Sequence, residues 1–170
     1  MNLNKYILHK AIDADICKEW AVKINQANGV DDLLKMYVAG IDFCLKNNFP
    51  DNADILTLGE GKLAAYGIHI DEIIALQDKP LIVLLGDCIA KHDITGYTSS
   101  QLFIKHNSKA TVTATDNAFL MIDCFDDSVL NLSAGGRSKV YINIYGNAQV
   151  THTCSDIANV KITNKNKLTY

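Results

Sequence analysis

The chain has 170 residues, of which 48% are hydrophobic and 21% are charged, and its formal net charge is −3. This composition is typical of a globular protein and excludes a disordered or collagen-like chain. The excess of acidic residues argues against a broadly basic nucleic-acid-binding protein, and the length allows one domain or a small head joined to a repeat segment.

The N-terminus and the cysteines favour a reducing compartment. No apolar run of signal-peptide length follows Met1, and the apolar run Leu81 to Leu85 is far shorter than the about 20 residues that span a membrane. The five cysteines are an odd number without a Cys-x-x-Cys pair, which argues against disulfides and a structural zinc site. We expect a cytoplasmic protein with free thiols, no metal, no cofactor and no membrane contact.

Residues 13–48 predict two helices joined by a short turn. Apolar residues recur every four positions from Ile16 to Ile24 and share one helix face, and Asn28-Gly29 ends that helix. The second helix begins near Asp31 and ends before the Phe49-Pro50 step. Because the second helix is acidic on balance, it is unsuited to a DNA groove, so we expect a packing hairpin and no nucleic-acid partner.

Glycines interrupt the next stretch, residues 51–78. Short helical turns are expected over residues 51–58 and 62–66, and the segment that follows Gly67 is expected to be extended. We therefore assign residues 1–78 to a helical head, which would cap the segment that follows.

From Lys79 onward the sequence repeats every ten residues. Most units have a small residue at the second position and aliphatic residues at the fourth and sixth, and turn-forming residues gather at the unit ends. All units have ten residues except the fourth, which has eight, and they start at Lys79, Ile89, Ser99, Lys109, Asn117, Asp127, Arg137, Asn147 and Ile157.

The repeat predicts a solenoid, because a short strand cannot bury its apolar side alone whereas stacked units close a continuous core. We predict an α+β protein: a small N-terminal α-helical region followed by a single-stranded parallel β-helix of about nine short strands. Right-handed coiling is favoured by analogy with the crossover rule. The solenoid is expected over residues 79–166, with a tail over 167–170, and an antiparallel meander is the alternative.

With two strands per coil, alternate units share a face, and the two faces differ. One face is rich in threonine and is predicted to be wet, whereas the other is apolar and aromatic. Soluble monomers rarely expose large apolar patches, so we predict that the helical head or a second copy covers the aromatic face. The predicted interface residues are Phe103, Phe119, Met121, Phe125, Tyr141 and Tyr145.

One pair of side chains carries candidate chemistry. His106 and Cys124 fall in the same inward column of neighbouring units, and a Cys–His pair is in principle a nucleophile arrangement. The sequence indicates neither an orienting third group nor an open cleft. We therefore interpret the pair as a core histidine beside a buried thiol, assign no catalytic residue, and keep a small enzyme built on this pair as the third hypothesis.

Two segments resemble an uncharacterised family of small proteins from gut bacteria and their phages. They are Ile41–Pro50 (IDFCLKNNFP) and Gly96–Ser108 (GYTSSQLFIKHNS). The resemblance implies a helical start, a β-solenoid tail and a phage or mobile-element origin, and it implies no activity or catalytic residue.

Together these features predict a non-enzymatic structural or interaction module that self-associates through the aromatic face. Its expected partner is a second copy or another protein. The alternative is a carbohydrate-binding or carbohydrate-processing solenoid that uses Tyr97, Tyr141 or Tyr145.

Overall fold

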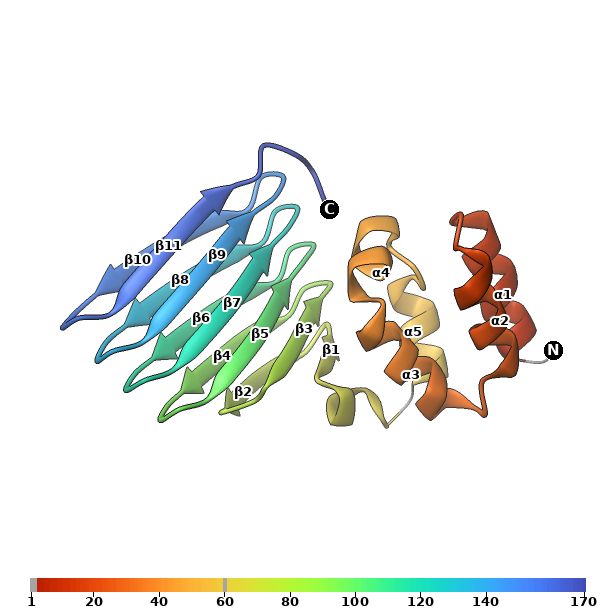
Figure 1. Ribbon diagram of the computed structural model, residues 1–170, viewed down its shortest axis with the longest axis horizontal. Helices are drawn as coiled ribbons and strands as arrows, with labels where there is room; N and C mark the ends of the chain where they lie inside the picture. The colour runs from red at the N-terminus through yellow and green to blue at the C-terminus, as the bar shows by residue number, and fades with distance from the viewer. Residues whose placement is uncertain (1–2, 60) are drawn as a thin grey trace. The chain divides into compact units, whose positions relative to one another are not determined.

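The chain forms one helical and one β unit, as the predicted α+β class requires. The computed structural model describes residues 3–59 and 61–170, and its two compact units divide between Tyr66 and Gly67. Helices come first along the chain and all the strands follow (Figure 1). No helix within the described ranges is long and apolar enough to cross a membrane.

Among the described residues the helical unit contains five α-helices and one 3-10 helix. They are α1 (Leu3–Asp13), α2 (Lys18–Gln26), α3 (Val30–Ala39), α4 (Ile41–Asn47), α5 (Asn52–Leu58) and the 3-10 helix η1 (Leu63–Tyr66). The prediction of one helix after Asp31 is wrong, because Gly40 leaves the helical region (φ −108°, ψ 30°) and separates α3 from α4. The sequence also did not predict α1, whose buried face is narrow and contains Ile7 and Ala11.

A polar cluster joins α1 to the start of α5. The Asp51 side chain caps α5 by accepting the Asp54 N–H at 2.9 Å. Asp54 is itself nearly buried, accepts the Tyr6 hydroxyl at 2.7 Å and pairs with Lys10. The hydrogen bond to Asp54 is the main reason why the pKa of Lys10 is raised.

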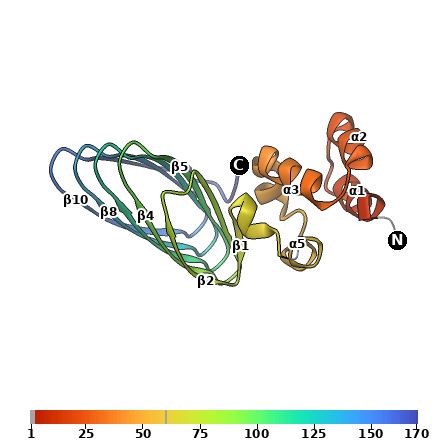
Figure 2. The same ribbon diagram turned by 90° about the horizontal axis from the view of Figure 1, so that it is seen from below.

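The β unit is a parallel solenoid of about five turns with two strands per turn (Figures 1 and 2). Its strands are β1 (Ile68–Ile70), β2 (Ile73–Gln77), β3 (Leu81–Leu85), β4 (Ile89–Ile94), β5 (Ser99–Ile104), β6 (Lys109–Ala114), β7 (Phe119–Cys124), β8 (Val129–Ala134), β9 (Lys139–Ile144), β10 (Gln149–Cys154) and β11 (Asn159–Asn164). Sheet A has the order β1-β3-β5-β7-β9-β11, and sheet B has the order β10-β8-β6-β4-β2. The pairings are parallel, which contradicts the antiparallel meander.

The coil begins earlier in the chain than the repeat indicates. Ile68 of β1 pairs with Val83, and Ile73 of β2 pairs with Ile89. In later coils the equivalent residues lie 20 apart, as the hydrogen bond from Asn143 to Asp123 illustrates. The first coil is therefore shorter than the others, and its strands depart from the ten-residue repeat and lie within residues 1–78, the range predicted to form the head.

The register also corrects the alignment of the units. Ser99 pairs with Phe119, so the fourth unit has ten residues and not eight. From the fifth unit onward the small residue therefore lies in the turn before a strand, as buried Ala118, Ser128 and Ser138 show. The small residues of the second to fourth units, Ala90, Ser100 and Ala110, lie inside strands and point into the core.

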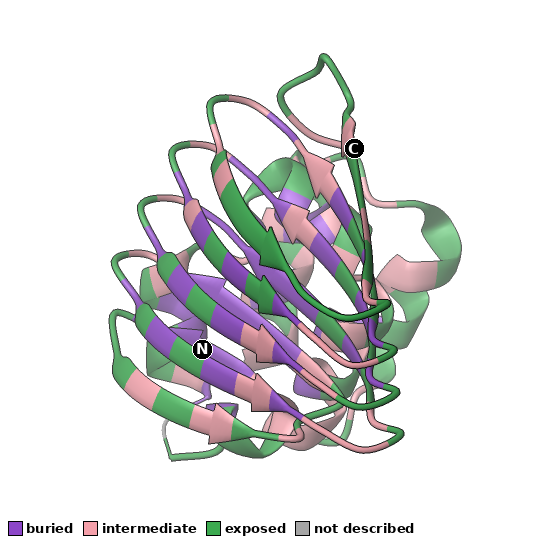
Figure 3. Cartoon of the chain, turned by 90° about the vertical axis from the view of Figure 1, so that its left-hand side faces the viewer, coloured by how far each residue is buried: buried purple, intermediate pink, exposed green. Residues whose placement is uncertain are grey.

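Inward side chains of both sheets form one continuous core. Along each central strand buried and exposed residues alternate, which Figure 3 shows as alternating purple and green bands. Complete burial of a Leu or Ile side chain stabilises a fold by about 1.5–3 kcal/mol. The largest fully buried aliphatic side chains of the core include Leu84, Ile94, Leu102, Ile104, Leu120, Ile122, Leu130 and Ile142.

The turns use a left-handed residue that also connects neighbouring coils. In the turns between β4 and β11 the second residue has φ between 56° and 63°, and these residues are Gly96, His106, Asp116, Asp126, Gly136, Gly146 and Asp156. Where this residue is Asp, its carboxylate can accept a backbone N–H from the preceding coil. Asp116 accepts the Gly96 N–H and Asp156 accepts the Gly136 N–H, both at 2.9 Å.

Gly136 and Gly96 make a matched test of this turn. An added Cβ at Gly136 would lie 2.8 Å from the Asp116 backbone nitrogen, whereas one at Gly96 would meet nothing within 4 Å. Both glycines have positive φ, so Gly96→Ala is expected to cost about 1–2 kcal/mol through backbone strain alone. We expect Gly136→Ala to lower the free energy of unfolding further, as measured by urea denaturation. Equal losses in the two variants would contradict the close packing of successive turns.

Candidate interaction surface

The outer face of sheet A carries an exposed cluster of three large side chains. Phe119, Met121 and Tyr141 are 37%, 44% and 40% exposed, and we call these three residues the aromatic patch. Phe119 and Met121 alternate outward on β7, and Tyr141 pairs with Met121 from β9. The Phe119 and Tyr141 ring centroids lie 5.7 Å apart. The patch is thus a continuous surface on two hydrogen-bonded strands.

Polar residues border the aromatic patch. Lys139 is the ladder partner of Phe119, and Lys161 is the ladder partner of Tyr141. Asp123 follows Met121 on the same face and accepts a hydrogen bond from the Asn143 side-chain amide at 2.7 Å. The patch therefore has cationic residues towards the end of the solenoid and a carboxylate beside its centre.

The other three predicted interface residues are buried and do not belong to an exposed surface. Phe103 pairs in register with Val83, in a column that is closed to solvent at both residues. Phe125 and Tyr145 are buried and stacked, with centroids 4.7 Å apart and planes at 13°. Tyr145 therefore cannot offer its ring to a carbohydrate. Alternation along a strand indicates that a side chain points outward, and it does not indicate whether solvent reaches it.

Lys105 is a feature that the sequence did not lead us to predict. This residue is the first of the turn after β5 and is 4% exposed, although lysine is among the least often buried residues. Its Nζ lies 3.1 Å from Asp126 Oδ2 and 5.5 Å from the centroid of the Phe125 ring. The available signal was that Lys105 shares a column with Phe125 and Tyr145 in the 20-residue register, because a cation among aromatic side chains needs a partner.

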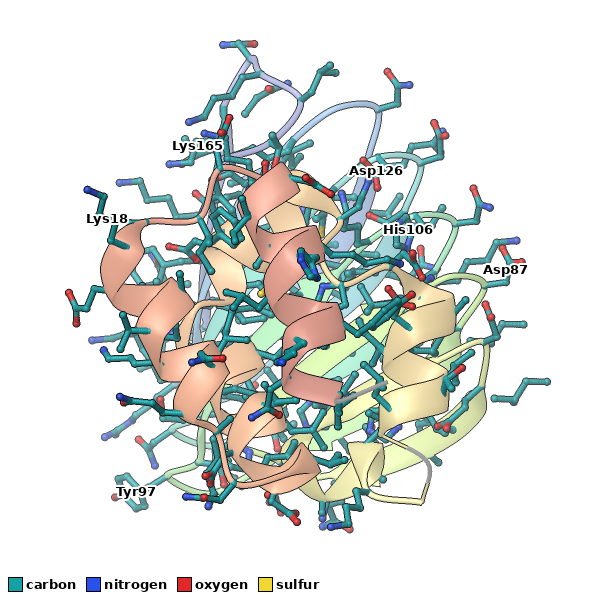
Figure 4. The ribbon with its side chains drawn as sticks, turned by 90° about the vertical axis from the view of Figure 1, so that its right-hand side faces the viewer. Lys18, Asp87, Tyr97, His106, Asp126 and Lys165 are labelled. Carbon is teal, nitrogen blue, oxygen red and sulfur yellow. The ribbon has the colours of Figure 1, made fainter. Side chains whose placement is uncertain are left out.

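His106 and Cys124 do not share an inward column. Cys124 pairs with Ile104 and is buried, and burial raises the pKa of its thiol. His106 lies instead in the turn, where its Nδ1 accepts the Gly86 N–H at 2.9 Å and burial lowers its pKa. Figure 4 shows His106 near Asp126 and Asp87 along one edge of the solenoid. The column alignment behind the predicted pair is therefore wrong, and a buried thiol with a raised pKa is a poor nucleophile.

The outer face of sheet B is mostly polar, as predicted, although the ladder partners Ile73 and Ile89 are 84% and 51% exposed on β2 and β4. Thr151 donates to the Asn131 side-chain oxygen at 2.5 Å, and Thr153 donates to the Ser133 hydroxyl at 3.3 Å. These bonds connect side chains of neighbouring coils. Over residues 3–59 and 61–170, no group of three or more His, Cys, Asp or Glu side chains is placed to hold a metal ion.

No family model matches the chain. Comparisons with curated proteins and with solved structures found no match either. A functional argument therefore depends on the surfaces described above, of which the aromatic patch is the most apolar exposed part of the central coils.

Proposed function

We propose that this protein is a non-enzymatic structural or interaction module that self-associates through the aromatic patch. The observation that carries the proposal is the contiguous exposure of Phe119, Met121 and Tyr141 on one rigid sheet. Single exposed apolar residues are ordinary on protein surfaces, whereas a cluster rimmed by polar groups is typical of an interaction site.

The position of the patch favours tight association. Its side chains stand on central, fully paired strands, so the backbone has little conformational freedom left to lose on binding. Aromatic residues are also the side chains that most often dominate the binding energy of protein interfaces.

The charges around the patch favour a second copy as the partner. Along the strand direction, Lys139 and Asp123 lie on opposite sides of the Met121–Tyr141 pair. Lys139 is the ladder partner of Phe119, and Asp123 is the ladder partner of Asn143. In a face-to-face dimer with two-fold symmetry, each patch covers the other, and Lys139 of one copy can approach Asp123 of the other. Two sheets pack in this way about 10 Å apart in β-sandwiches.

Replacing two patch residues with carboxylates tests the proposal. The double variant Phe119→Asp with Tyr141→Asp would bring four buried charges into the dimer interface, so we expect its dissociation constant to rise by at least about tenfold. Light scattering at a series of protein concentrations measures this change. The matched control is Thr111→Asp with Asn131→Asp, which adds the same charge to adjacent coils of sheet B and is expected to leave the molar mass unchanged.

Circular dichroism shows whether a lower molar mass of the double variant results from unfolding or from loss of the dimer interface. An unchanged molar mass in the folded Phe119→Asp, Tyr141→Asp variant would refute self-association through the patch. A glycan array with the wild-type protein tests the carbohydrate alternative, and binding that Tyr141→Asp abolishes would favour that function instead.

A further inference from the structure

The last coil of the solenoid exposes its interior. In the central coils the inward side chains are buried, whereas in β10 the inward residues His152 and Cys154 are exposed and Val150 is only half-buried. On β11, Ile162 is 38% exposed. β10 and β11 also lie at the edges of their sheets. This end therefore combines two open strand edges with inward side chains that no further coil buries.

The backbone of β10 presents a regular set of unpaired groups. The Gln149 N–H donates to Ser128, and the Ser155 N–H donates to Ala134, both at 2.9 Å. Because successive residues of a strand direct their N–H and C=O groups to opposite sides, the odd-numbered residues bond to β8. The even-numbered residues of β10 direct theirs away from the sheet.

The side chains of β10 leave this edge unprotected. Proteins usually block an edge strand with a lysine, a proline or a bulge. β11 has Lys161 on its outer face, whereas β10 (QVTHTC) contains no lysine, carboxylate or proline and is rich in β-branched residues. A strand without charges can pair with its own copy without placing like charges opposite each other.

We propose that β10 pairs antiparallel with β10 of a second copy, so that two solenoids meet end to end. A two-fold axis perpendicular to the solenoid makes facing strands antiparallel. In this pairing the free backbone N–H and C=O groups of the even-numbered residues bond to those of the second copy. His152 then lies opposite His152 of the second copy, and Val150 lies opposite its Cys154. Three such pairs supply about six backbone hydrogen bonds, and the inward columns of the two copies become continuous.

The area of the solenoid end formed by β10 and β11 is large enough for a second copy to bind there. A six-residue strand is about 20 Å long, and two sheets with their outward side chains are about 20 Å thick. The cross-section is then about 400 Å² per copy before the turns are counted, so the total approaches the about 1,000 Å² of a small specific interface. This dimer is expected to be dependent on concentration. It uses a different surface from the aromatic patch.

A disulfide reports the proposed register. In a background with the exposed Cys17 replaced by serine, Val150→Cys places a thiol opposite Cys154 of the second copy, with an expected Cα separation of about 5.5 Å. Mild oxidation is expected to give a covalent dimer, which peptide mapping should identify as a 150–154 bond. The two positions are about 13 Å apart within one strand, so the bond cannot form within one chain.

Two controls make the disulfide test specific. Adding Cys154→Ser is expected to abolish the covalent dimer, and Cys154 without Val150→Cys is expected to form none, because 154 does not face itself. Adding Phe119→Asp and Tyr141→Asp is expected to leave the 150–154 bond intact, which separates a failure of this proposal from a failure of the aromatic patch.

A charge test works without any cysteine chemistry. Thr151 and Thr153 point outward and face each other across the proposed pairing, so Thr151→Lys with Thr153→Lys sets lysines against lysines. In the Phe119→Asp, Tyr141→Asp background, which lacks the aromatic patch, we expect the dimer dissociation constant to rise by at least about tenfold in sedimentation equilibrium. The control Thr111→Lys with Thr113→Lys uses the same two columns two coils away and should not change it. Absence of the 150–154 bond, or equal effects of the two lysine pairs, would overturn the proposal.

Discussion

Replacing Asp126 with glycine is expected to lower the free energy of unfolding by about 3 kcal/mol. Asp126 Oδ2 is the partner of the buried Lys105 Nζ at 3.1 Å and also accepts the His106 N–H at 3.1 Å. Glycine tolerates the left-handed backbone at this position, so the loss isolates the side chain. A buried ammonium whose partner is removed costs much more than the intact pair contributes.

Two further variants separate the charge from the hydrogen bond. Asp126→Asn keeps an acceptor for the His106 N–H and tolerates positive φ, but it removes the charge that Lys105 needs. Asp126→Asn is therefore expected to lower the free energy of unfolding, but by less than Asp126→Gly does. In a Lys105→Met background the buried charge is absent, and Asp126→Gly is then expected to cost only about 1 kcal/mol.

Urea denaturation followed by far-ultraviolet circular dichroism measures these differences as a double-mutant cycle. Lys105→Met alone is expected to be nearly neutral, since it keeps the apolar stem over the Phe125 ring. If Asp126→Gly costs the same with Lys105 and with Met at position 105, the pair contributes nothing and the explanation fails.

His92 is expected to make the solenoid unstable in weak acid. The ring lies in the core on β4, where its Nε2 accepts the Lys79 N–H at 3.3 Å and its Nδ1 has no hydrogen-bond partner. Burial lowers the pKa of His92 to about 4, although the charges of Asp78 and Asp93 act in the opposite direction. The folded protein therefore holds this histidine neutral.

The direction of the pH effect follows from the two protonation states. An unfolded histidine has a pKa near 6.5, so below that pH the unfolded chain binds a proton that the folded chain excludes until about pH 4. Stability is complete above about pH 6.5 and decreases as the pH falls towards 4, by a total of about 3 kcal/mol. Carboxylates contribute mainly below this window, because their unfolded pKa values are near 4.

His92→Leu is expected to remove most of this pH dependence. Leucine suits the position, because the same inward column holds Leu76, Val112 and Leu132. Unfolding free energies from urea titrations at several pH values between about 7 and 4.5 test the expectation. The control His9→Gln changes an exposed histidine of α1 and should retain the wild-type slope. An unchanged slope in His92→Leu would assign the acid sensitivity to other groups.

The aromatic patch shows where reasoning from the sequence succeeded. Alternation over residues 119–124 is sufficient to place Phe119 and Met121 outward, and the repeat places Tyr141 on the same face. Outward placement alone did not reveal that Phe103, Phe125 and Tyr145 are buried, because alternation along one strand carries no information about what packs over its outer side chains. Misalignment of one unit was sufficient to create the false His106–Cys124 column.

The amino-acid sequence by itself determined the coil, its two unlike faces and its core. A ten-residue repeat with period-two alternation has few other ways to bury its apolar side chains, because single strands cannot do so alone. Only the tertiary structure decided the register of the first coil, the break at Gly40, the burial of Lys105 beside Asp126 and the open edge of β10. These features arise from pairing between segments distant in the chain, and local side-chain patterns do not encode which neighbour each segment meets.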